Sequence, residues 1–147
     1  MKVAIGSDHR GFLLKEQIKS AFTPQNIEFT DFGAKSRESC DYPDFAFPVA
    51  EAVAQGRAEK GILICGSGNG MLIAANKVKG VRAAAALSPE MARLSRLHND
   101  ANVLAIPADY VEPQLVSKIV KVWLETPFEG GRHLRRLEKI SEYESNS

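Results

Sequence analysis

Residues 65–70, with the sequence Cys-Gly-Ser-Gly-Asn-Gly, combine a thiol, a hydroxyl and three glycines in one short segment. They begin at the end of an apolar run, residues 61–65, and precede a helical pattern, so they are expected to connect a buried strand to a helix. Glycines in such a turn let backbone N–H groups gather around an anion at the helix N-terminus. A plain tight turn is the alternative, but a cradle for a phosphate or an oxyanion is favoured.

The same segment does not match two common nucleotide-binding motifs. Met71 stands where the dinucleotide fingerprint G-x-G-x-x-G requires its third glycine, and the lysine of a Walker loop is missing. The three histidines and two cysteines show neither H-E-x-x-H nor C-x-x-C spacing. Neither a metal site nor another cofactor is therefore expected.

Cys65 is the residue of this segment best suited to catalysis. A cysteine at the end of a buried strand is by itself more often a small core residue than a catalyst. Its place before a helix N-terminus, however, predicts a lowered thiol pKa. A thiolate there could remove a proton from carbon beside a carbonyl, while backbone N–H groups hold the enediolate oxygen. Cys40 lies in a polar loop and is assigned no role.

Two further segments carry histidines at informative places. Asp8 and His9 directly follow the first predicted strand, where a parallel α/β sheet binds its ligand. His98 and Asn99 lie where a helix ends and the next strand begins, which is the opposite edge of the sheet from Cys65. His98 either caps its helix C-terminus or reaches the active site of a second subunit. The second option requires a homodimer.

Arg132 and Arg136 are four residues apart and share one face of the last predicted helix, directly after two glycines. Most charged helix faces are simply solvated. Two guanidinium groups on one face would nevertheless suit a phosphate.

Strand-like and helical patterns alternate along the chain. Strands are expected at residues 2–6, 27–32, 61–65, 81–87 and 103–106. Helical patterns between and after them include residues 45–55, 89–98 and 132–143. Five β-α units predict an α/β fold, a single-domain, Rossmann-like three-layer sandwich with a five-stranded parallel sheet. The domain is expected to cover residues 1–143, with a flexible tail at residues 144–147.

The overall composition excludes several classes of partner. Nineteen Lys and Arg residues against eighteen Asp and Glu residues leave a formal charge of +1, so neither nucleic acid nor a membrane surface is an expected partner. The first residues do not form a signal peptide, and no apolar run approaches the ~20 residues of a membrane span. A cytoplasmic protein is expected.

Together these segments resemble ribose-5-phosphate isomerase type B over essentially the whole chain. The matching stretches are residues 6–9 with 11–15, Asp41-Tyr42-Pro43, residues 61–68 with 73–77, residues 98–104, and Glu129-Gly130-Gly131-Arg132-His133. The resemblance implies a metal-free Rossmann-like homodimer. A tetramer built from two such dimers stays an open alternative. It also implies the interconversion of D-ribose 5-phosphate and D-ribulose 5-phosphate in the pentose phosphate pathway.

The resemblance further implies a role for individual residues. Cys65 would move the proton between C1 and C2, Ser67 would assist proton movement between the oxygens, and His98 would open the furanose ring. The implied substrate-binding residues are Asp8, His9, Tyr42, Gly66, Gly68, Asn69, Gly70, Asn99, Arg132 and Arg136. Residues 66–70 would form the anion hole, and the two arginines would hold the phosphate with help from His9.

Asp109 departs from the pattern of this family, which commonly has a phosphate-contacting arginine there. A carboxylate near a phosphate repels it unless the carboxylate turns away or binds a hydroxyl. Arg10 or Arg135 are the candidates to compensate. An isomerase of a six-carbon phosphosugar, such as allose or galactose 6-phosphate, therefore remains an alternative. A non-catalytic domain that binds sugar phosphates or nucleotides is the alternative from a different class.

Overall fold

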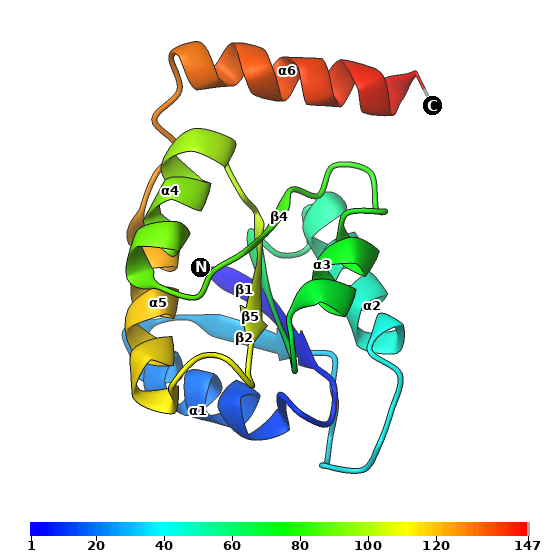
Figure 1. The fold of residues 1–147 in the computed structure, drawn as a ribbon, viewed down its shortest axis with the longest axis vertical. Coiled ribbons are helices and arrows are strands. Elements are labelled where there is room, and N and C mark those ends of the chain that lie inside the picture. Colours follow the sequence, from blue (N-terminus) through cyan, green and yellow to red (C-terminus); the bar gives the residue numbers. More distant parts are fainter. Residues whose placement is uncertain (147) are drawn as a thin grey trace.

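The order of the strands determines which loops can meet at the ligand-binding edge. The structure, a computed structural model, describes residues 1–146 and contains one sheet with the order β2-β1-β3-β5-β4. The strands are β1 (Lys2–Ser7), β2 (Glu28–Asp31), β3 (Lys60–Cys65), β4 (Ala83–Ala85) and β5 (Val103–Pro107). Every pairing is parallel, so all carboxyl ends point to one edge of the sheet, the lower edge in Figure 1.

Helices cover both faces of this sheet. They are α1 (Phe12–Phe22), α2 (Pro43–Ala54), α3 (Asn69–Ala75), α4 (Pro89–Asn99), α5 (Pro113–Glu125) and α6 (Arg132–Ser145), with the short 3-10 turn η1 (Thr23–Gln25) after α1. Apolar side chains of α1, α4 and α5 pack in one core cluster with Ile5, Ile62 and Leu104. Those of α2 and α3 pack in a second cluster with Ala4 and Leu63. The predicted three-layer α/β fold is confirmed.

Apolar periodicity marks the buried face of a helix, and a side-chain cap marks the start of α4. α5 buries Val116, Ile119 and Trp123, which lie on one face at helical spacing. α4 begins after Ser88, whose side chain accepts a hydrogen bond from the N–H of Met91. Within residues 1–146, no helix combines the length and the apolar character that a membrane span requires.

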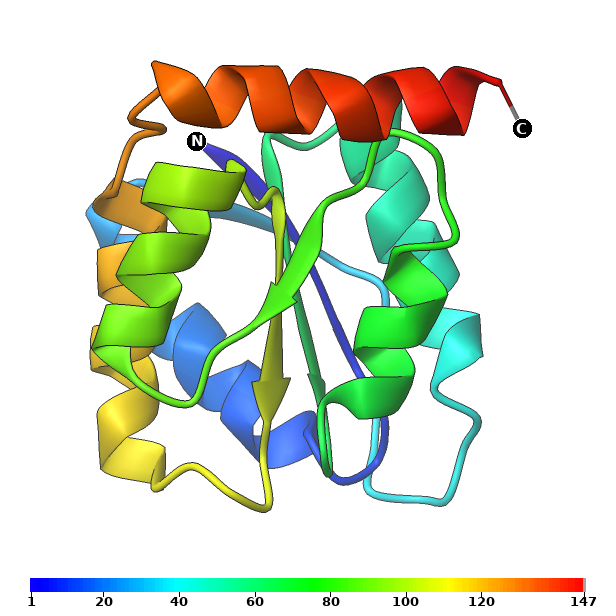
Figure 2. The same ribbon diagram turned by 45° about the horizontal axis from the view of Figure 1, so that its top comes forward.

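α6 crosses the edge of the sheet opposite to the carboxyl ends of the strands (Figure 2). Leu137 is buried and, with Ile140, lines a groove of about 470 Å³ beneath the helix. Leu134 and Tyr143, in contrast, expose 48% and 81% of their surface. The last helix therefore carries exposed apolar side chains.

Three of the elements bounded in the sequence prediction have an end that differs from it by two residues or more. β4 spans three residues rather than residues 81–87, because it is an edge strand that pairs only with β5 over that length. α2 begins at Pro43, whose fixed φ suits the first helical position. α6 continues through Ser145, into the predicted tail, and Glu144 Oε1 accepts a hydrogen bond from the N–H of Gly80 at 2.8 Å. Ser147, the end of that predicted tail, lies outside the described residues.

Lys60, the first residue of β3, is a cation placed beside apolar side chains. Its Nζ donates a hydrogen bond to the carbonyl oxygen of Leu124 at 3.2 Å and lies 5.4 Å from the centre of the Trp123 ring. Burial, followed by repulsion from Arg96, lowers the pKa of Lys60 from 10.5 to about 8. The folded protein therefore binds this proton less tightly than the unfolded chain does.

We expect the stability of the wild-type protein, relative to a Lys60→Met variant, to rise by about 1–2 kcal/mol between about pH 8 and pH 10. In this window the unfolded chain keeps a proton that the folded protein has released, so a rise in pH favours folding. Urea unfolding of both proteins at pH 7 and pH 10 measures the difference. A Lys2→Met variant controls for the loss of one exposed positive charge. The same pH dependence in wild type and Lys60→Met would contradict the prediction.

Candidate active site

The carboxyl edge of the sheet brings together the turns that follow β1, β3 and β5. β1 and β3 are neighbours at the centre of the sheet, and the chain continues from them in opposite directions, from β1 to β2 and from β3 towards β4 and β5. Open α/β sheets bind ligands in the crevice at such a switch point. A cavity of about 320 Å³ opens here, lined by Asp8, His9, Arg10, Cys65, Gly66, Ser67, Asp109 and Tyr110.

Asp8 is a buried carboxylate that holds the turn after β1 in shape. Its Oδ1 accepts hydrogen bonds from the N–H groups of Arg10, at 2.9 Å, and Gly11, at 3.1 Å. Glycine is required at position 11, because a Cβ atom there would lie 2.5 Å from the carbonyl oxygen of Ile64. The turn is thus packed directly against β3, one residue away from Cys65.

His9 is oriented by a loop far away in the sequence. Its Nδ1 accepts a hydrogen bond from the backbone N–H of Cys40 at 3.3 Å. A neutral imidazole that accepts at Nδ1 carries its hydrogen on Nε2. His9 therefore has an N–H donor available for an anion in the cavity. Cys40, to which the sequence assigned no role, contributes through its backbone.

Cys65 ends β3 and is buried, with only 4% of its surface exposed. Burial raises the pKa of its thiol above the ordinary value, and the carboxylates of Asp8 and Asp109 act in the same direction. Backbone N–H groups of Met71 and Gly68 lower the pKa but do not outweigh burial. The prediction that the helix N-terminus would lower the pKa of Cys65 is therefore wrong for this subunit.

The turn after β3 has the backbone shape expected of an anion cradle. Gly68 has a φ of +81°, a left-handed conformation that glycine adopts without strain. Ser67 is exposed, and its Oγ accepts a hydrogen bond from the N–H of Asn69 at 3.2 Å. Gly70 lies under the ring of Tyr42, where a Cβ atom would come within 2.6 Å of ring carbons. The structure thus brings Tyr42 against the glycine-rich turn.

Asp109 forms an ion pair with Arg10 at the mouth of the cavity. Arg10 Nη1 lies 3.0 Å from Asp109 Oδ2. The pair covers Gly66, where a Cβ atom would lie 2.7 Å from Arg10 and 2.8 Å from Asp109. Both side chains are about half exposed, so the pair contributes at most about 1 kcal/mol to stability. The carboxylate therefore lies against Gly66 of the glycine-rich turn, and its charge is paired with a guanidinium that itself lines the cavity.

The remaining predicted site residues lie at the other edge of the sheet. His98 and Asn99 end α4, and Arg132 and Arg136 are exposed on α6. α6 crosses the amino edge in both ribbon views, far from the turn after β3 (Figures 1 and 2). Among the described residues, the lining of the cavity at Cys65 includes none of these four. This agrees with the prediction that the two groups do not meet within one subunit.

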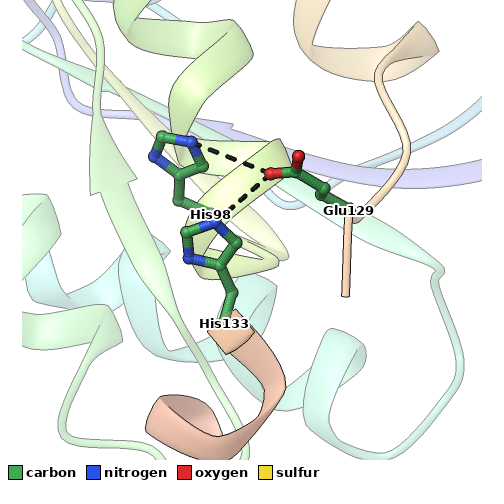
Figure 3. Close-up of side chains that lie close together, drawn as sticks. All are labelled: His98, Glu129 and His133. Carbon is green, nitrogen blue, oxygen red and sulfur yellow. Dashed lines mark ion pairs between the residues drawn. The ribbon is translucent and has the colours of Figure 1, made fainter. Parts of the chain in front are cut away.

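His98 belongs to a cluster that the sequence spacing did not reveal (Figure 3). Its ring stacks on the ring of His133, with centroids 4.4 Å apart and an interplanar angle of 20°. Glu129 Oε2 lies 3.2 Å from His133 Nε2 and 4.0 Å from His98 Nε2. His133 is buried, whereas His98 is partly exposed. The three side chains come from the end of α4, the loop after α5 and the first turn of α6.

The carboxyl edge of this parallel α/β sheet carries a thiol, an imidazole and a glycine-rich turn. This arrangement defines a class of small enzymes that handle anionic metabolites. The model of the ribose/galactose isomerase family matches residues 3–140 of this chain. Ribose-5-phosphate isomerase B of Escherichia coli strain K12 is 48% identical over 143 residues, which cover 97% of this chain and 96% of that protein.

Solved structures agree with the family match. Ribose-5-phosphate isomerase B of Clostridium thermocellum superposes with a TM-score of 0.97 at 50% identity and covers 99% of both chains. The same enzyme from Mycoplasma genitalium, with ribulose-5-phosphate bound, gives a TM-score of 0.96 at 43% identity, covering 99% of this chain and 97% of that one. This chain belongs to the ribose/galactose isomerase family. The resemblance drawn from the sequence motifs is confirmed.

Proposed function

We propose that this protein is an aldose–ketose isomerase that interconverts D-ribose 5-phosphate and D-ribulose 5-phosphate in the cytoplasm, as part of the pentose phosphate pathway. The observation that carries the proposal is the position of Cys65 in a cavity shared with Asp8, His9 and the exposed hydroxyl of Ser67. Relatives that match the chain over nearly its whole length are named for this reaction. The thiol, the hydroxyl and backbone donors supply the groups that the reaction needs, so no metal or other cofactor takes part.

The reaction moves one hydrogen between neighbouring carbons. The Cys65 thiolate takes the proton from C2 of the open-chain aldose, and the electron pair moves into the carbonyl to form an enediolate. The sulfur returns the proton to C1, while a proton passes from O2 to O1 with the help of Ser67. Backbone N–H groups of the glycine-rich turn, residues 66–70, stabilise the oxyanion, a contribution of roughly 3–4 kcal/mol for each well-placed donor.

We propose that a second copy of the chain completes the site. His98 of one subunit would open the furanose ring bound at Cys65 of the other, with Asn99 beside it and with Arg132 and Arg136 on the phosphate. Support comes from the separation of the two groups within one subunit and from the exposed apolar residues of α6. In a twofold homodimer each subunit then contributes to both sites. Two such dimers could pair into a tetramer without altering these contacts.

A second subunit also bears on the pKa of Cys65. Positive charge within a few ångströms stabilises a thiolate, and the isolated subunit leaves the burial of Cys65 uncompensated. The cationic side chains of α6 from the second subunit would supply part of that compensation. Dimer assembly would therefore both position the substrate and help to lower the pKa of the Cys65 thiol.

Arg10 is proposed to contact the substrate phosphate in place of the arginine that relatives commonly carry at position 109. We expect Arg10→Met to raise KM for ribose 5-phosphate about tenfold, because one charge-assisted hydrogen bond is lost, with kcat changed much less. Steady-state kinetics measures both constants. Arg57→Met, an exposed arginine in the loop after α2, is the matched control. An unchanged KM in Arg10→Met would show that Arg10 only neutralises Asp109.

The substrate is tested by assaying ribose 5-phosphate and allose 6-phosphate side by side. Faster turnover of the five-carbon sugar is expected. A clear preference for the six-carbon sugar would instead support the alternative that Asp109 keeps open, a hexose phosphate isomerase with Asp109 on a sugar hydroxyl. Binding of both sugars without turnover of either would reject an enzyme and indicate a sugar-phosphate-binding domain.

A further inference from the structure

The cluster of His98, Glu129 and His133 has the composition and the spacing of a metal site. One ligand atom from each residue lies within 4.8 Å of the other two. A tetrahedral zinc ion with bonds of about 2.0–2.1 Å separates its ligand atoms by about 3.3–3.4 Å. Glu129 Oε2 lies 3.2 and 4.0 Å from the two imidazole nitrogens, which is near this separation. Because the two rings are stacked at an interplanar angle of 20°, His98 must turn out of the stack for both lone pairs to meet at one ion.

We propose that these three residues bind one divalent cation of the zinc class in each subunit. Two imidazoles and one carboxylate are donors that Zn²⁺ accepts, and three protein ligands leave one coordination position open. The ion would lie where both imidazole Nε2 atoms face the carboxylate (Figure 3).

The surroundings restrain Glu129 and His133 before any ion arrives. His133 is 6% exposed, so its ring has little freedom. The backbone N–H of Glu129 donates a hydrogen bond to the carbonyl oxygen of Leu97 at 3.1 Å, which ties the loop to α4. His98 lies in the last turn of α4, where the helix dipole favours a positive charge. Arg93, which interacts with Glu129, opposes a cation and limits the affinity.

Occupation of this site would inhibit the isomerase. A metal bound to His98 Nε2 removes the nitrogen that would otherwise give a proton to the ring oxygen. This regulatory part rests on the proposed role of His98, whereas metal binding itself does not. The ion would be an inhibitor, and the proposed chemistry at Cys65 still requires no cofactor.

Calorimetric titration of Zn²⁺ into the whole protein tests the site. One equivalent per subunit is expected, and both Glu129→Gln and His133→Asn should weaken binding at least about tenfold. Cys40→Ala is the control, because Cys40 Sγ and His9 Nδ1, 3.8 Å apart, are another pair of potential ligands. Binding that is unchanged in both cluster variants, or lost in Cys40→Ala, would overturn the proposal.

Cobalt provides a second measurement that does not depend on how well the variants fold. Co²⁺ bound by imidazole and carboxylate in the wild-type protein should show visible ligand-field bands without a sulfur-to-cobalt charge-transfer band. A charge-transfer band would place the metal on a cysteine and overturn the assignment.

Enzyme kinetics then tests whether the bound ion inhibits turnover, separately from whether it binds. Zn²⁺ should inhibit wild-type turnover over the same concentration range in which it binds, and Glu129→Gln should need at least about tenfold more. Binding at the cluster without inhibition would confirm the metal site and overturn the inhibitory role. That outcome would also count against His98 as the ring-opening acid, whereas absent binding with normal isomerase activity would reject the metal site alone.

Discussion

Cys65→Ala is expected to lower kcat for ribose 5-phosphate by about 10³-fold or more, with KM changed by less than about threefold. The sulfur is the base in the proposed reaction, and alanine leaves no proton acceptor in its place. Substrate binding depends on the glycine-rich turn and on charged groups, which the substitution leaves in place. Steady-state rates and a direct binding measurement of ribulose 5-phosphate check the two halves of the prediction.

Cys40→Ala is the matched control for this experiment. Cys40 contacts His9 mainly through its backbone N–H, which alanine retains, so near wild-type kinetics are expected.

The pH profile of the wild-type enzyme gives a further check on the base. Burial raises the pKa of the Cys65 thiol, so kcat/KM of the wild type should rise with pH as the thiolate forms. Retained activity in Cys65→Ala would eliminate the thiol as the base.

The sheet was predictable because its central strands contain short apolar runs and helical patterns separate the strands. Residues 61–65 and 103–106, for example, are buried on both faces and contain almost no polar side chain. β4 was predicted too long because Val81, Ala86 and Leu87 extend the apolar pattern beyond it, while an edge strand has only one neighbour to pair with. The length of an edge strand depends on tertiary contacts, which local composition does not record.

The residues of the candidate site were predictable where they follow a strand directly. Asp8, His9 and Cys65 are examples, since parallel topology fixes the edge at which a strand ends. The Arg10–Asp109 pair joins residues ninety-nine positions apart, and only folding shows that they meet. The rise in the pKa of Cys65 was missed for a related reason. The helix N-terminus is visible in the sequence, but the depth of burial that outweighs it is not.

Mixing two inactive variants is expected to restore activity if the site is shared between subunits. Cys65→Ala lacks the base and His98→Asn lacks the ring-opening acid, so each homodimer has two defective sites. A heterodimer of the two has one site with both substitutions and one site with neither. With random exchange of subunits, about a quarter of all sites become intact, so activity should recover to about a quarter of the wild-type value.

The measurement is the rate with cyclic ribose 5-phosphate after the two variants are unfolded together and refolded. Each variant refolded alone is the control, and His98→Asn alone should lose more activity on the cyclic sugar than on an open-chain substrate. Mixing Cys65→Ala with Cys65→Ser provides a matched negative control, because no combination of these two restores a thiol. A mixture of Cys65→Ala and His98→Asn that is no more active than its components would mean that each site is built within one subunit. His98 would then be left as a cap of α4, and the groove beneath α6 would need another explanation.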